Sequence, residues 1–131
     1  FEGNQISMLP GTQTEANQIE KTFQGQGLEV QKFLLEQASE ETLKKLENPD
    51  ILHIATHGFF MEDIPENINE NKGTFLNNTQ KLAENPLLRS GLLLAGAEIG
   101  IQGEHGNNED GILTAYEAQN LNLDNTQLVV L

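Results

Sequence analysis

The stretch Asp50-Ile-Leu-His-Ile-Ala-Thr-His-Gly58 decides the fold of this chain. Residues 51–56 are almost continuously apolar, which is the pattern of a strand whose two faces are both covered in a parallel sheet. This strand runs directly into His57 and Gly58, and the glycine allows the backbone to turn sharply. Because ligands of open α/β sheets bind beyond the carboxyl ends of the strands, His57 is the leading candidate for chemistry.

Composition bounds the class of protein. The chain has 131 residues, the size of one domain, and a net charge of −13, with 7 Lys and Arg against 20 Asp and Glu. This balance argues against direct contact with nucleic acid and against an anionic membrane surface, because both need clustered basic residues. The absence of cysteine excludes disulfides, thiolate metal sites and a cysteine nucleophile within this sequence. No Gly-rich phosphate motif is present, so we expect no cofactor.

The apolar runs and the two ends of the sequence indicate where the protein is located and whether the domain is complete. The sequence has no signal-peptide pattern and no apolar run close to the roughly 20 residues that span a bilayer, so we expect a cytoplasmic protein. The chain starts at Phe1 without an initiator Met and stops at Leu131 within an apolar run. We therefore expect a piece of a longer protein, cut at both ends.

The order of the expected elements predicts an α/β sandwich with a mainly parallel sheet. Thr12 and Glu15 form a capping-box pattern at the first expected helix, Ser39 caps the second, and Thr114 and Glu117 form another box. The Asn- and Glu-rich residues 61–86 are expected to form a long mobile insertion. In chain order the expected elements are helix 12–24, strand 28–35, helix 40–47, strand 51–56, a short helix near 78–84, hairpin-like strands at 90–96 and 112–113 on either side of loop 103–111, helix 115–120 and strand 127–131.

His57 and Gly58 form the candidate catalytic pair. An imidazole can exchange protons near neutral pH, and the Gly58 N–H can supply one half of an oxyanion hole. The alternative is a histidine at the end of a strand that bonds only to backbone. Asp110-Gly-Ile-Leu-Thr-Ala-Tyr-Glu117 is the other organised segment, and it reads either as a turn into a capped helix or as a wall of the same crevice.

The remaining histidines do not predict a metal site. His53 and His57 share a face of a strand but lie roughly 13 Å apart, too far to share one ion. We expect His53 to be a core histidine with a backbone partner. His105 lies in an acidic loop with Glu104, Glu109 and Asp110, but the ordered spacing of an EF-hand loop is missing.

Three ordered segments resemble a known family. Ile51-Leu-His-Ile-Ala-Thr-His-Gly58 is similar to the histidine motif of CHAT domains, the caspase-like modules often fused to tetratricopeptide repeats. Leu9-Pro-Gly-Thr-Gln-Thr-Glu-Ala16 resembles the segment that opens their first helix. Residues 110–117, followed by Leu128-Val-Val-Leu131, resemble the stretch that leads to the cysteine of the family. Together these motifs cover nearly all of the chain.

The resemblance implies a caspase-like three-layer sandwich and a cysteine endopeptidase with a Cys-His dyad, acting on a protein or peptide substrate. His57 takes the role of the dyad histidine and Gly58 that of an oxyanion-hole donor. The cysteine of the family follows the last strand, beyond Leu131, and the first strand of the family precedes Phe1. We therefore interpret residues 1–131 as a partial domain, which we expect to be poorly stable alone because a missing central strand leaves backbone groups unpaired.

Two other interpretations stay open. A degenerate copy would keep the fold and serve as a scaffold or protein-interaction module, and the residue type a few positions beyond Leu131 separates this from the peptidase. An unrelated α/β ligand-binding domain would be favoured by a buried His57 with no crevice beside it.

Overall fold

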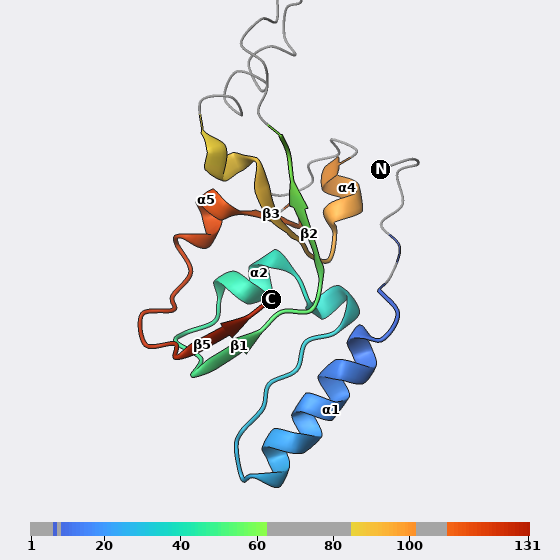
Figure 1. Cartoon of the computed structure of the whole chain (residues 1–131), viewed down its shortest axis with the longest axis vertical. Coiled ribbons are helices and arrows are strands. Elements are labelled where there is room, and N and C mark those ends of the chain that lie inside the picture. Colours follow the sequence, from blue (N-terminus) through green and yellow to red (C-terminus); the bar gives the residue numbers. More distant parts are fainter. Residues whose placement is uncertain (1–6, 8, 63–84, 102–109) are drawn as a thin grey trace, which may run out of the picture.

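The computed structural model describes residues 7, 9–62, 85–101 and 110–131. Helices and strands are interspersed along the chain, and the strands build two small sheets (Figure 1), which confirms the predicted α/β class. The elements in chain order are α1 (Thr12–Gly25), the 3-10 turn η1 (Leu35–Gln37), α2 (Glu40–Lys44), β1 (Ile51–His53), β2 (His57–Phe60), the 3-10 turn η2 (Pro86–Leu88), β3 (Ser90–Leu93), α4 (Ala97–Ile101), β4 (Ile112–Thr114), α5 (Ala115–Ala118) and β5 (Leu128–Val130).

The two sheets differ in the relative direction of their strands. β1 and β5 are parallel, with Ile51 opposite Leu128 and His53 opposite Val130. The expected parallel sheet is thus present as this pair. Beside it, β2, β3 and β4 form an antiparallel sheet in that spatial order. The hairpin-like strands expected at 90–96 and 112–113 are its antiparallel pair β3 and β4, whereas β2 was not expected as a strand of its own. The two sheets are successive in the chain, because β1 leads into β2 through only three residues, 54–56.

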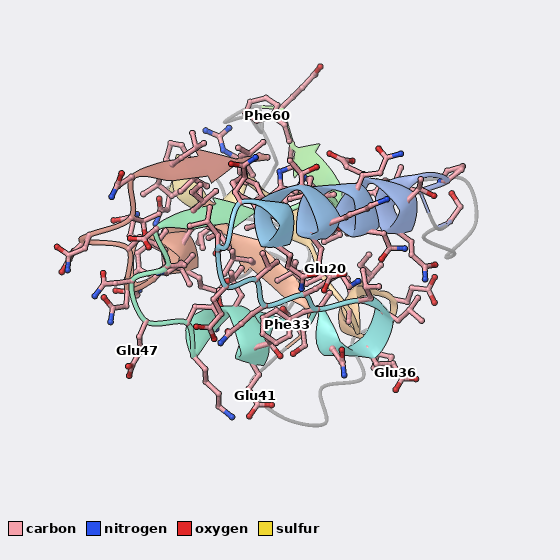
Figure 2. All side chains as sticks on the ribbon, turned by 90° about the horizontal axis from the view of Figure 1, so that it is seen from below. Glu20, Phe33, Glu36, Glu41, Glu47 and Phe60 are labelled. Carbon is pink, nitrogen blue, oxygen red and sulfur yellow. The ribbon has the colours of Figure 1, made fainter. Side chains whose placement is uncertain are left out.

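The predicted strand at 28–35 is wrong. Among the described residues this segment pairs with no strand, and η1 begins at its end. Val30, Phe33 and Leu35 would be the core residues of such a strand, but Phe33 (labelled in Figure 2) is 40% exposed and Leu35 is 66% exposed. The segment is held instead to α1, because the Lys32 ammonium bonds to the Glu20 carboxylate. Its apolar residues predicted a strand, but a strand also needs a neighbour with which to share hydrogen bonds.

The helix starts follow the predicted caps at two of three positions. The Ser39 hydroxyl accepts a hydrogen bond from the Thr42 N–H at 3.2 Å, and the Thr114–Glu117 capping box is complete. At α1 the predicted capping box is wrong, although the helix itself is confirmed. Gly11, at φ 99°, takes the cap position, so Thr12 is already inside the helix.

The core lies between the two sheets. Leu43 of α2, Leu52 of β1 and Leu113 of β4 are buried together and belong to both sheets and the helix that packs on them. Partly buried residues complete this cluster, and they are Leu46, Ile54, Leu92, Leu94, Ala118, Leu121 and Leu123. Burial of these apolar side chains therefore fixes how the parallel pair sits against the antiparallel sheet.

Several of the predicted elements lie wholly or mostly outside the residues that the structure describes. Most of the predicted insertion at 61–86, including the helix near 78–84, lies outside the described residues, as does most of loop 103–111. Of the insertion, Pro86 starts η2, and the Asn85 side chain caps it by accepting from the Leu87 N–H at 3.1 Å. Within the described ranges, no helix is both long and apolar enough to cross a membrane.

Candidate functional site

The candidate site lies at the carboxyl end of the parallel pair. Because β1 and β5 run in the same direction and in register, the residues that follow them emerge at the same end of the sheet. The pairing continues past β1, where the Ile54 N–H donates to the Val130 carbonyl at 2.9 Å. His57 therefore follows one strand, and Leu131 follows the other, at a shared end (Figure 1).

His57 does not end the buried strand as predicted. The parallel strand stops at His53, the chain bends over residues 54–56, and His57 is the first residue of β2. There it lies opposite Leu93 of β3, and it is half-buried. The bend is held by the Thr56 hydroxyl, which donates to the Leu93 carbonyl. His57 thus stands at the junction of the two sheets.

Gly58 does not provide the sharp turn that the sequence suggested. It lies inside β2 opposite Leu92, and its φ is not in the left-handed region. An added Cβ would meet the Gly91 carbonyl oxygen at 3.7 Å and the Leu92 Cδ2 at 3.9 Å, both ordinary contacts. Neither backbone strain nor crowding inside the protein therefore requires a glycine here.

The hydrogen-bond pattern of the sheet gives the direction of the Gly58 N–H. Opposed residues of antiparallel strands alternate between pairs that exchange hydrogen bonds and pairs that do not. Continuing the register of β2 and β3, the Met61 N–H donates to the Arg89 carbonyl at 2.7 Å. Counting back from Met61 in steps of two, His57 and Leu93 form a hydrogen-bonded pair, whereas Gly58 and Leu92 form a pair that exchanges no hydrogen bonds. The Gly58 N–H is therefore directed away from β3, toward the outer edge of β2, where no other strand of the described ranges pairs with it.

His53 has a different partner from the one expected. Its Nε2 lies 3.0 Å from Oε1 of Glu15, on α1, and a quarter of its side chain is exposed. The prediction of a core histidine bonded to backbone is therefore wrong. The sequence assigned Glu15 to a capping box with Thr12, but Gly11 is the N-cap and no side chain caps α1, so the Glu15 carboxylate bonds to His53 of β1 instead. This contact ties α1 to the strand that leads to His57.

A buried carboxylate that the sequence did not single out joins three elements. Glu40 is 1% exposed, its carboxylate pairs with the Lys44 ammonium, and its Oε2 accepts from the Gly111 N–H at 3.2 Å. Lys44 also lies 3.5 Å from Glu117 of α5. In sequence Glu40 resembles any acidic residue in a first helical turn, so no local signal marked it. Its burial locks α2 to the loop before β4.

The electrostatics of this network favour the ionised carboxylate of Glu117. Burial by itself would raise the pKa of Glu117, but hydrogen bonds from the backbone and hydroxyl of Thr114, with the charge of Lys44, lower that pKa below its ordinary value. Asp110 acts locally, because its Oδ1 accepts from the Ile112 N–H at 2.9 Å and closes a turn. Whether Asp110 also borders a substrate stays a prediction.

The structure brings together no metal ligands in the part of the chain that it describes. There, no group of three or more His, Asp or Glu side chains is arranged to hold an ion. His105, Glu104 and Glu109 lie outside the described residues.

The whole chain, residues 1–131, matches the CHAT domain family. No curated protein and no solved structure matches it significantly. The mixed α/β fold, with its parallel pair and adjoining antiparallel sheet, is consistent with a caspase-like protein. This chain belongs to the CHAT family, whose members are caspase-like and serve as peptidases or protein-interaction modules, often beside tetratricopeptide repeats.

Proposed function

We propose that this domain supplies the histidine half of a Cys-His peptidase centre. His57 assists formation of the cysteine thiolate and later protonates the leaving amine of the cleaved peptide. The Gly58 N–H, with the N–H of the cysteine, holds the negative charge that develops on the substrate carbonyl oxygen. Residues 1–131 contain no cysteine, and the resemblance to CHAT domains implies that the nucleophilic cysteine would follow β5 in a longer parent protein.

The parallel pairing of β1 with β5 carries this proposal. It brings the chain that leads to His57 and the chain that leaves Val130 to one end of the same sheet. A nucleophile a few residues after β5 would therefore lie at the same end of the sheet as His57, the first residue of β2. The open direction of the Gly58 N–H supports the oxyanion role, since an N–H bonded within the ladder would not be available to a substrate.

The partners follow from the same proposal. The substrate is a protein or peptide, and a fused tetratricopeptide-repeat domain in the parent regulates access to it. The acidic balance of the chain gives no support for a nucleic acid as a direct partner. We propose that the protein acts in the cytoplasm.

The test is replacement of His57 by Ala in the full-length protein, with cleavage of a proteome-derived peptide library read by mass spectrometry. We expect His57→Ala to abolish cleavage while the protein stays folded. His53→Gln is the matched control, because it changes the neighbouring histidine yet keeps a hydrogen-bonding group for Glu15. Equal turnover by His57→Ala and wild type would end the assignment.

A second candidate is a scaffold or interaction module that keeps the fold without catalysis. Residues 1–131 contain no cysteine, so this sequence is compatible with a scaffold as well as with the peptidase. The residue type a few positions after Leu131 in the parent sequence separates the two, since cysteine there favours the peptidase and any other residue favours the scaffold.

A further inference from the structure

We infer that Thr56 is a positioning residue that sets the direction of the His57 imidazole. This inference deepens the proposed function and rests on it. It starts from one contact, in which the part-buried Thr56 hydroxyl donates to the carbonyl oxygen of Leu93. Leu93 is also the residue that lies opposite His57 in the antiparallel sheet.

Two adjacent residues, Thr56 and His57, therefore donate hydrogen bonds to the carbonyl oxygen of Leu93. The His57 pair with Leu93 is of the hydrogen-bonded kind, as the Met61 to Arg89 bond establishes for this register. The His57 N–H and the Thr56 hydroxyl thus converge on the Leu93 oxygen, and both lone pairs of that oxygen are used. This fixes the peptide unit between Thr56 and His57, and with it the direction in which the His57 Cα–Cβ bond leaves the backbone.

Leu93 is itself a rigid anchor. It is 6% exposed, and the residue that follows it in β3 donates from its N–H to the Gly111 carbonyl at 2.7 Å. The Thr56 bond therefore ties a three-residue bend to the central strand of the antiparallel sheet. Without the hydroxyl, the bend would keep its bonds at Ile54 to the parallel pair and at His57 to β3, but Thr56 itself would lose its bond to the sheet.

The size of the effect follows from the geometry that a dyad requires. A displacement of about 1 Å in a reacting group lowers turnover by about 100-fold, because the pair must meet in a narrow range of orientations. Thr56→Val keeps the shape of the side chain and removes the hydroxyl, while Thr56→Ser keeps the hydroxyl. We expect Thr56→Val to lower kcat by about 10- to 100-fold with KM nearly unchanged, and Thr56→Ser to restore most of kcat.

The full-length protein is the material for this test, with the peptide library used to find a substrate for steady-state kinetics. Thr22→Val is the matched control, because the Thr22 hydroxyl also donates to a backbone carbonyl, that of Gln18 at 2.8 Å, but on the exposed side of α1. Loss of kcat in Thr56→Val alone, with rescue by Thr56→Ser, supports the inference. Equal kcat in Thr56→Val and wild type, with His57→Ala inactive, overturns the inference and leaves the proposed function standing.

A second measurement reads the position of His57 without catalysis. The ring resonances of His57 and His53 are followed by NMR in the same variants. Positioning by Thr56 predicts that the His57 ring signals shift and broaden in Thr56→Val and return in Thr56→Ser, while the His53 ring signals stay in place. Unchanged His57 signals in Thr56→Val reject the inference, and this result holds even if His57→Ala shows that the protein is no peptidase.

Discussion

Replacement of Gly58 by Pro tests the oxyanion role directly, since proline removes the backbone N–H and nothing else that the proposal needs. The structure indicates that the fold tolerates this change. The Gly58 N–H is directed away from β3, so no ladder bond is lost, and proline is accepted on edge strands in that orientation. His57 is in a strand, which is the conformation favoured for a residue before proline.

Gly58→Ala is the matched variant, because it adds a side chain but keeps the N–H. The nearest atoms to the added Cβ are 3.7 and 3.9 Å away, so no neighbour has to move. Comparing the two variants separates loss of the hydrogen-bond donor from the mere presence of a larger residue. Phe60→Pro is a second control. Like Gly58, Phe60 belongs to a pair that exchanges no hydrogen bonds with β3, so its N–H also faces the outer edge of β2. Phe60 (labelled in Figure 2) is 76% exposed.

The expected magnitude is that of one oxyanion donor. Removing such a donor lowers kcat by about 100- to 1,000-fold, or about 3–4 kcal/mol of transition-state stabilisation. We expect this loss for Gly58→Pro, with KM little changed, because the donor acts on charge that develops only in the transition state. Gly58→Ala and Phe60→Pro should keep most of the wild-type kcat.

The assay is steady-state cleavage of one library-derived peptide by the full-length protein, with kcat and KM determined separately. Thermal unfolding of each variant shows whether the edge strand is intact. If folded Gly58→Pro turns over at the rate of Gly58→Ala, the Gly58 N–H stabilises no oxyanion and this part of the proposal is refuted. If Phe60→Pro loses as much kcat as Gly58→Pro, the loss is caused by proline in the edge strand and not by removal of the Gly58 N–H.

Two predictions concern the framework around the site. Gly111→Ala should destabilise the domain by at least about 2 kcal/mol, because alanine is strained in the left-handed conformation and its Cβ needs room that is not there. Gly111 has φ 74°, and an added Cβ would lie 2.3 Å from the Ala97 nitrogen; a urea midpoint equal to that of wild type would contradict this. Because the pKa of Glu117 is lowered in the folded protein, its ionised form adds stability at neutral pH that is lost as the pH falls below about 4. The difference in urea midpoint between wild type and Glu117→Gln should therefore shrink on acidification, and a difference that grows would show the opposite shift.

Local signals in the sequence were sufficient where the interaction itself is local. The Ser39 cap and the Thr114–Glu117 capping box join residues three apart, so the sequence pattern contains both partners. The helix at α1 follows from its periodic apolar residues in the same way. The cap of α1 was mispredicted because the left-handed φ of Gly11 makes that glycine the N-cap and draws Thr12 into the helix, which the pattern of residues does not reveal.

The sequence by itself determined the α/β class, most of the helices and the identity of His57 and Gly58 as the candidate pair. It did so because apolar periodicity, caps and a histidine after a buried strand are properties of neighbours along the chain. Only the tertiary structure decided that β1 stops at His53, that Thr56 bonds to Leu93, and that Glu40 is buried. Each of these depends on partners at least 37 residues away, or on which strand lies beside which, and a linear pattern does not record such contacts.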